Sequence, residues 1–516
     1  MWLDNSLRWG KHLNETLIKT QKFLNILKVL RGSGWGAHPD HLRRLYLSLI
    51  RSRFDYGCYL YDNSAQVHCN KIDVVQNQSL RIIGGFIRST PIHAMEAELS
   101  IPPLHVRRMY LAYKYCSKIR AWIDNKSNEC INNLLTACQS NSFWVRKKIP
   151  LLVTCYGKMV NEVIYSSSVL DMFNLKTWVT NFDSENIIKI NLECINTAKK
   201  DYEINALKYE LSKELNEKYY NYYFIFTDGS KSGTDRGAAF YDANSSEDGL
   251  YLFNNCFKIN SNISIMSVEL IGISKAINYI NYVRHNKFVI CSDSKSSLQH
   301  ISRCASGRRG VSIAYDIISQ LNDLLDRGID IKLQWVPSHV GLKGNERADS
   351  LAKIASVYGL EYNVFPNYSE LLPKYRLTCY GFWKEYFNRR SMEKGIWYRC
   401  IQSEPPHVPW FLRTKLSRAT IVTALRLRTG HMPLNKFAFL MKKKDSPNCD
   451  TCGVVEDVHH LLTECTSFEQ ERHAIMLSFN LNQHDVGLFN SLLANASSDA
   501  AKHLYMAVSH HLISRH

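Results

Sequence analysis

The 516-residue sequence contains no run of about 20 apolar residues, so it offers no candidate for a membrane span. Its first residues, Met1-Trp2-Leu3-Asp4-Asn5, lack the basic start and apolar stretch of a secretory signal. The 15 cysteines are scattered except for one group near the C-terminus, which argues against a disulfide framework. We therefore expect an intracellular protein of the nucleus or cytoplasm, with free thiols and no membrane partner.

Acidic residues are scarce relative to basic ones, and the net charge is +17 at pH 7. The excess is concentrated at the N-terminal end, where residues 1–150 contain 22 Lys and Arg against 10 Asp and Glu. Residues 221–360, by contrast, contain 15 against 13. A local positive field is typical of a surface that binds phosphate groups, although a well-solvated basic surface has the same composition.

The order of apolar patterns predicts four regions. We expect a basic helical bundle over residues 1–150, a linker over 151–220, an α/β unit over 221–358 and a helical C-terminal region over 370–516. In the α/β unit, three strands precede alternating helices and strands, which predicts a mixed sheet packed by helices. The expected strands are 222–228, 236–241, 251–259, 288–292 and 331–336, and the expected helices are 266–283, 296–302, 313–327 and 345–358.

The second helix expected in the N-terminal bundle, over residues 39–59, combines apolar and basic positions. Arg43, Arg44, Arg51 and Arg53 interrupt its apolar residues and are candidates for contacts with nucleic acid. The same pattern is also typical of an ordinary solvated helix face.

Four acidic residues of the α/β unit occupy positions that would bring them together. Asp228 and Asp293 end predicted strands, where an open sheet places its ligand crevice, and Glu269 and Asp349 lie in the first turns of predicted helices. Four converging carboxylates repel one another unless divalent cations neutralise them. Ligands that are all oxygen atoms suit Mg²⁺ or Mn²⁺, and two such ions can promote cleavage of a phosphodiester. Any one of these acids by itself would be interpreted as a surface residue.

A second candidate metal centre lies near the C-terminus. Cys449, Cys452, His460 and Cys465 have the spacing of a tetrahedral zinc site, with His459 as a competing ligand. The alternative is a set of reduced cysteines without a metal.

Several motifs of residues 221–358 are similar to those of the type 1 ribonuclease H domain carried by retroelements. They are Thr227-Asp228-Gly229-Ser230, Val268-Glu269-Leu270, Ser292-Asp293-Ser294, Trp335-Val336-Pro337-Ser338-His339-Val340-Gly341 and Gly344-Asn345-Glu346-Arg347-Ala348-Asp349. The resemblance implies hydrolysis of the RNA strand of RNA–DNA hybrids, leaving 3′-hydroxyl and 5′-phosphate ends. It also implies that the four carboxylates hold two Mg²⁺ or Mn²⁺ ions, that His339 assists proton transfer or product release, and that Ser230 and Asn345 contact nucleic acid. Ile265 and Met266 depart from the polar residues that cellular members carry there.

The flanking regions resemble the reverse transcriptase polyprotein of jockey-type non-LTR retrotransposons. The resemblance includes a thumb-like helical segment that grips the template–primer duplex and, around Arg428-Thr429-Gly430-His431 and the Cys/His set, a zinc-knuckle-like tail. The N-terminal segments are Trp2-Leu3-Asp4, Trp35-Gly36, Asp55-Tyr56-Gly57-Cys58, Gln76-Asn77-Gln78-Ser79-Leu80-Arg81 and Pro102-Pro103-Leu104-His105.

The adjacent aspartates of the family's polymerase site are absent, because the sequence contains no Asp-Asp pair. We therefore expect a C-terminal fragment of such a polyprotein that has ribonuclease H activity but does not synthesise DNA. The alternative is an inactive or co-opted nucleic-acid-binding remnant.

Overall fold

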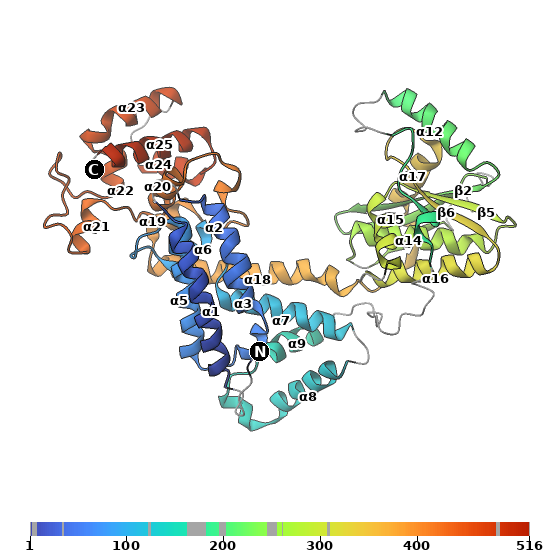
Figure 1. Cartoon of the computed structure of the whole chain (residues 1–516), viewed down its shortest axis with the longest axis horizontal. Coiled ribbons are helices and arrows are strands. Elements are labelled where there is room, and N and C mark those ends of the chain that lie inside the picture. The colour runs from blue at the N-terminus through green and yellow to red at the C-terminus, as the bar shows by residue number, and fades with distance from the viewer. Residues whose placement is uncertain are drawn as a thin grey trace. The chain divides into compact units, whose positions relative to one another are not determined.

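The computed structural model of the protein describes residues 2, 8–32, 36–121, 125–162, 182–195, 203–244, 255–260, 262–306, 310–480 and 486–514. The chain forms two compact units (Figure 1). The helical unit comprises Met1–Tyr113, Asn133–Lys158 and Lys374–His516, and the sheet unit comprises Lys114–Asn132 and Met159–Pro373. No helix within the described ranges is long and apolar enough to cross a membrane.

The sheet unit is built on one mixed sheet, as the sequence predicts. Its described strands are β1 (Ile188–Lys189), β2 (Tyr223–Ser232), β3 (Asp235–Asp242), β4 (Cys256–Ile259), β5 (Lys287–Ser292), β6 (Asp330–Trp335) and β7 (Leu360–Tyr362). They lie in the order β1-β6-β5-β2-β3-β4-β7. β1, β6, β5 and β2 are parallel to their neighbours, β3 is antiparallel to both β2 and β4, and β7 is parallel to β4. The sheet unit therefore has a mixed α/β fold of the ribonuclease H-like type.

Helices cover both faces of this sheet because successive strand residues point to opposite sides. Ile290 belongs to the core beneath α14 (Ile265–Ile280), α15 (Lys295–Ala305) and α16 (Ser312–Asp326). Its neighbours Val289 and Cys291 pack on the other face, against α12 (Ile204–Lys218) and α17 (Lys343–Tyr358). A Cβ on Gly237 of β3 would lie 2.2 Å from the Ala352 carbonyl oxygen of α17, so this glycine permits the close approach of that helix.

Part of the predicted linker over residues 151–220 belongs to the sheet unit. β1 pairs with β6, and Leu207, Leu211 and Leu215 of α12 are buried against the sheet. The sequence reading missed this because β1 has only two residues and because three leucines at four-residue spacing give one narrow stripe on a charged helix. The same span also contains α9 (Leu151–Asn161) and α11 (Ser184–Ile187).

The helical unit joins two regions that the sequence predicts as separate. Leu42 and Tyr46 of the N-terminal bundle share one core with Phe411, Ile421 and Leu425. Its main described helices are α1 (Gly10–Val29), α2 (Pro39–Leu45), α5 (Gln66–Gly84), α6 (Ile92–Glu98), α7 (Leu104–Arg120), α18 (Leu372–Glu393), α20 (Arg418–Thr429), α22 (Val458–Thr463), α23 (Glu469–Ser478), α24 (Val486–Ala494) and α25 (Asp499–Ser514), and a π-helical segment over Tyr46–Arg51 follows α2. Its other helices are α3 (Ser52–Asp55), α4 (Cys58–Tyr61), α19 (Ile396–Ile401) and α21 (Asn435–Leu440), and α8 (Lys126–Ser140) begins in the sheet unit and ends in the helical unit. Hydrophobic periodicity identifies each buried face but not its partner, so the shared core is a tertiary result.

An ion pair is buried within this shared unit. Arg428 Nε lies 2.8 Å from Glu98 Oε1, and the two side chains are 2% and 1% exposed. Arg428, part of the motif quoted for the C-terminal tail, therefore has a structural partner and does not face solvent.

Candidate functional site

The end of the parallel pairing between β2 and β5 places two aspartates beside each other. The pairing stops at Thr227 and Ser292, and the next residues are Asp228 and Asp293. β2 itself continues to Ser232, with Asp228 opposite Ala239 of β3. Asp228 therefore lies within its strand and not at the strand end that the sequence predicts, because β3 extends the ladder on its other side.

Glu269 joins these two aspartates from the first turns of α14. One oxygen from each of Asp228, Glu269 and Asp293 lies within 4.8 Å of the others. A Cβ on Gly229 would come 2.9 Å from the Glu269 backbone nitrogen, so the strand can approach the helix this closely only with glycine there. Three of the four predicted carboxylates thus form one compact group.

Burial and mutual repulsion favour the protonated forms of these three carboxylates. Burial, followed by the negative charge of Asp293, raises the pKa of Asp228 to about 8. Burial and then the Asp228 charge raise the pKa of Glu269 well above its ordinary value. Burial also raises the pKa of Asp293, although a hydrogen bond from Asn345 and the nearby His339 oppose the rise. Burial and mutual repulsion therefore outweigh the nearby positive groups at these three carboxylates.

The arrangement of these oxygens fits a divalent cation. Glu269 Oε2 is buried and has no hydrogen-bond partner, which is a costly state for a carboxylate oxygen. A hard cation with oxygen ligands would both neutralise the repulsion and provide the missing partner.

Asp349 lies beside this group but belongs to a second one. It lies in α17, where its carboxylate adds to the negative potential at Asp228 and pairs with Lys353 Nζ at 2.7 Å. Ligand atoms of Asp349, His339 and Glu346 lie within 4.8 Å of one another. Glu346 was quoted within a motif without a role, and only its proximity to His339 and Asp349 in the fold draws attention to it.

His339 lies in the loop between β6 and α17. It is exposed and has a left-handed backbone, with φ of 50°, which is uncommon for a residue other than glycine. The buried Val340 follows it and anchors the loop to the core. The buried Val340 therefore attaches the loop to the core, and the loop holds His339 at the edge of the carboxylate group.

Other side chains position the group. Asn345 is buried and donates a hydrogen bond to Asp293, and Trp335 Nε1 donates to the Asp293 carbonyl oxygen at 3.1 Å. These bonds fix the segment that follows β5. Ser230, predicted to contact nucleic acid, is half-buried on β2 opposite Gly237.

Glu370 also holds the first turn of α14, and the sequence analysis missed it. Its Oε1 accepts hydrogen bonds from Ser264 N at 2.7 Å and from Ser267 Oγ at 2.8 Å. In the sequence, Asn367 and Glu370 have the spacing of a capping box, which predicts a local role for Glu370. That spacing does not show that Glu370 also contacts α14.

The four arginines predicted to bind nucleic acid differ in their exposure to solvent and in their hydrogen-bond partners. Arg43 donates to the carbonyl oxygens of Leu99 and Ser100 at 2.8 and 3.2 Å, and Arg51 is buried. The predicted role of Arg51 does not fit its burial, and Arg43 already has structural partners. Arg44 and Arg53 remain exposed, so the basic pattern of this helix mixes structural and solvent-facing cations.

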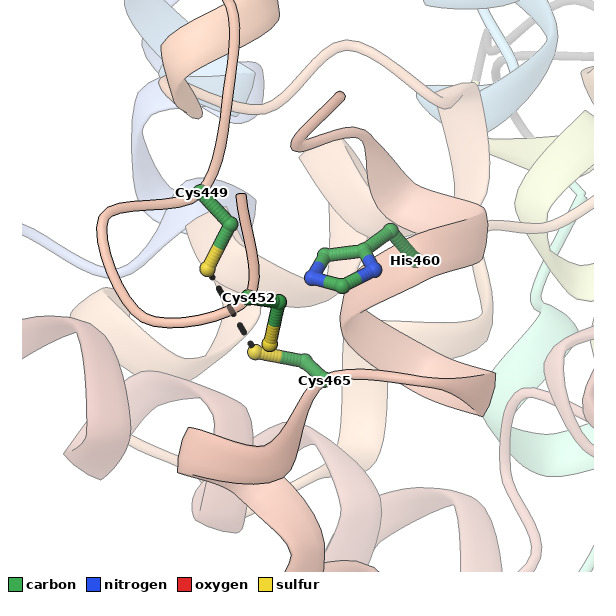
Figure 2. A group of neighbouring side chains, drawn as sticks. All are labelled: Cys449, Cys452, His460 and Cys465. Carbon is green, nitrogen blue, oxygen red and sulfur yellow. Dashed lines mark hydrogen bonds between the residues drawn. The ribbon is translucent and has the colours of Figure 1, made fainter. Parts of the chain in front are cut away.

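The C-terminal cysteines and one histidine converge in the helical unit (Figure 2). Ligand atoms of Cys449, Cys452, His460 and Cys465 lie within 4.8 Å of one another, and the Sγ atoms of Cys449 and Cys465 are 3.9 Å apart. Three sulfur ligands and one nitrogen ligand are the donors of a structural zinc site.

The structure distinguishes the two candidate histidines. His460 is buried, its Nε2 has no hydrogen-bond partner, and its Nδ1 lies 3.4 Å from Glu464 Oε2. A carboxylate on one ring nitrogen orients the other towards a metal. The His459 side chain, by contrast, is 45% exposed. The group of ligand atoms that could hold a metal therefore includes His460 and not His459.

The electrostatics of the cysteines also fit a metal. Hydrogen bonds from the Thr466 hydroxyl and backbone amide lower the pKa of Cys452 to about 6. The thiolate is the form that binds metals, so the lowered pKa increases the fraction of Cys452 that can coordinate one at neutral pH.

Comparison with known proteins identifies the sheet unit. The family model for RNase H matches residues 220–357, which include the carboxylate group and the His339 loop. A search of curated proteins found no significant match. Domains of this family hydrolyse the RNA strand of RNA–DNA hybrids, typically with Mg²⁺. Residues 220–357 of this chain are therefore similar to the RNase H family, whose members are hydrolases acting on RNA–DNA hybrids.

Proposed function

We propose that this chain is an active endoribonuclease that cleaves the RNA strand of RNA–DNA hybrids with two Mg²⁺ or Mn²⁺ ions. The observation that carries the proposal is the group formed by Asp228, Glu269 and Asp293, with the unpartnered buried oxygen of Glu269. Such a group is costly to retain unless cations bind there.

In this proposal the four carboxylates have a shared role. Asp228, Glu269 and Asp293 hold the ions, and Asp349 completes the set from α17. When bound, two such ions lower the pKa of the attacking water and stabilise the leaving oxygen. His339, beside Glu346 and Asp349, carries a proton or helps the product to leave, for which an exposed loop residue is well placed.

Selectivity for RNA would come from contacts to 2′-hydroxyl groups in the minor groove of the hybrid. Ser230 and Asn345 are the proposed contacts on the sheet unit, although Asn345 is buried and also holds Asp293. Ile265, at the start of α14, is 44% exposed and offers no hydrogen bond to the strand. We therefore expect residues 182–373, which include β1, α12 and Glu370, to bind the hybrid more weakly than the whole chain at matched salt.

The alternative is a nucleic-acid-binding protein without catalysis, which the basic charge of residues 1–150 favours. A labelled RNA–DNA hybrid with Mg²⁺ separates the two, with Asp293→Asn as the inactive variant. Asp326→Asn, an exposed position on α16, removes the same charge away from the site. Cleavage by the wild type and Asp326→Asn but not by Asp293→Asn supports the enzyme, and no cleavage by the wild type in Mg²⁺ or Mn²⁺ supports the binding protein.

We also propose that Cys449, Cys452, His460 and Cys465 hold one structural Zn²⁺. Metal analysis of the purified chain should find about one zinc per molecule, since a complete tetrahedral set binds tightly. Cys452→Ser should lose it, whereas Cys400→Ser, at an exposed free cysteine, should retain it. Well under one zinc in the wild type would contradict the proposal.

Finally, we propose an origin in a jockey-type retrotransposon polyprotein, on the strength of the ordered motifs outside the RNase H domain. Because the sequence has no adjacent aspartates, the chain should not extend a primer on a template. Nucleotide incorporation by the purified chain would overturn that part of the proposal.

A further inference from the structure

A cavity of about 800 Å³ lies within the helical unit, away from the residues assigned to catalysis or zinc. Five segments line it: the end of α1, the end of α5, α20 from Arg418 to Arg426, Pro433 and the last turns of α25. These segments are distant in sequence, so the cavity exists only because the N- and C-terminal regions share one fold.

The lining of the cavity is strongly basic. Five cationic residues contribute to it, and none of the described residues that line it is acidic. They are Lys28, Arg31, Arg81, Arg418 and Arg426. Lys28 and Arg31 are exposed at the rim, and the other three arginines are partly buried.

Backbone carbonyl groups hold the partly buried arginines in place. Arg418 donates to the carbonyl oxygens of Ala37, Ile82 and Ile83 at 3.1, 2.9 and 3.3 Å. Arg426 Nε donates to the Gly85 carbonyl oxygen at 2.7 Å. These bonds use only some of the five N–H groups of each guanidinium, so fixed donors remain.

Carbonyl oxygens orient these cations but do not neutralise them. Burial, together with the charge of neighbouring arginines, lowers the pKa of Arg418, and burial lowers that of Arg426. Arg81 Nε is buried without a hydrogen-bond partner. A concave site with several oriented cations and no carboxylate is complementary to an anion with several oxygen atoms.

We propose that this cavity binds backbone phosphates of a single nucleic-acid strand. Guanidinium groups match phosphate oxygens in geometry and charge. The cavity walls also include Val29, Ile82, Val422 and Leu512, against which an unpaired base can pack. A duplex holds its bases inside and could not place one there. The proposal adds a second nucleic-acid site and does not depend on catalysis by the RNase H domain.

The test measures binding of a fluorescent 12-nucleotide DNA strand to the full chain by anisotropy, without Mg²⁺, over a range of salt concentrations. The double variant Lys28→Gln, Arg31→Gln removes two exposed cations at the rim of the cavity. If both contact phosphates, affinity should fall by about tenfold or more, and the slope of log K against log salt should decrease by about 1.4. Arg426→Gln should weaken binding from inside the cavity, and Arg426→Lys should weaken it less.

The matched control is Lys22→Gln, Lys394→Gln, which removes two exposed cations of the helical unit that do not line the cavity. Retention of wild-type affinity and slope by this control supports the proposal. Equal losses in both double variants would overturn it, because diffuse charge would then explain binding. Binding of inorganic pyrophosphate that depends on Arg426, without binding of the strand, would also overturn it and assign the cavity to a free phosphate compound. A failure of hybrid cleavage would leave these measurements unaffected.

Discussion

The repulsion within the carboxylate group predicts that the metal-free sheet unit loses stability as the pH rises, and that Asp228→Asn removes a large part of this loss. The folded protein holds a proton on Asp228 up to a pKa of about 8, compared with the ordinary value of 3.8. Between these two values the folded state binds more protons than the unfolded state. Stability is therefore present at low pH and is lost as the pH rises towards 8.

The size of the effect follows from the raised pKa. At about 1.4 kcal/mol per pH unit, the contribution of Asp228 between pH 5 and pH 8 is about 4 kcal/mol. Part of that energy belongs jointly to Asp228, Glu269 and Asp293, because their titrations are coupled. In saturating Mg²⁺ the loss should disappear, since the cation replaces the proton as the source of positive charge.

Hydrogen exchange of the β2 and β5 amides in the full chain measures this locally, which matters because a chain of two units need not unfold in one step. Wild type and Asp228→Asn are compared at the same pH, so that intrinsic exchange rates cancel. The wild type should lose more protection between pH 5 and pH 8 in a chelator, but not in Mg²⁺. Identical pH profiles for the two proteins would refute the reasoning.

Three further predictions concern packing and positioning. Glu370→Ala should cost about 1–2 kcal/mol by removing the bonds that hold the first turn of α14, and it should also lower hybrid cleavage. Gly237→Val should destabilise the sheet unit by about 3 kcal/mol or more in thermal melting, because the added Cβ would overlap the backbone of α17, whereas Gly381→Ala has open space and should be tolerated. Glu98→Gln should destabilise the helical unit by about 3–5 kcal/mol in chemical denaturation, because Arg428 would remain buried without its counter-charge.

Each of these has a contrary outcome. Unchanged melting and cleavage in Glu370→Ala would show that α14 is held by its own packing. A stable Gly237→Val protein would mean that α17 can shift without cost. If Glu98→Gln were as stable as the wild type, other polar groups near Arg428 would have to compensate its charge.

The sequence by itself determined the sheet and most of the carboxylate group. Alternating strand patterns and strand-end acids can be read locally, because side chains two residues apart share a face of a strand and those three or four apart share a face of a helix. The four carboxylates, the His339 motif and the Cys/His spacing were all available in this way. The sequence also shows that Arg43 and Arg51 are basic. It does not show whether each side chain contacts a group of the protein or faces a ligand.

Only the tertiary structure decided which of these residues meet. It placed Asp228 within a strand because β3 continues the ladder, and it placed His460, not His459, among the three cysteines. It also joined the N- and C-terminal regions around one core and so formed the basic cavity. The physical reason is the same in each case: burial of a face is encoded in the spacing of residues along the chain, whereas the partner of that face depends on contacts between distant segments.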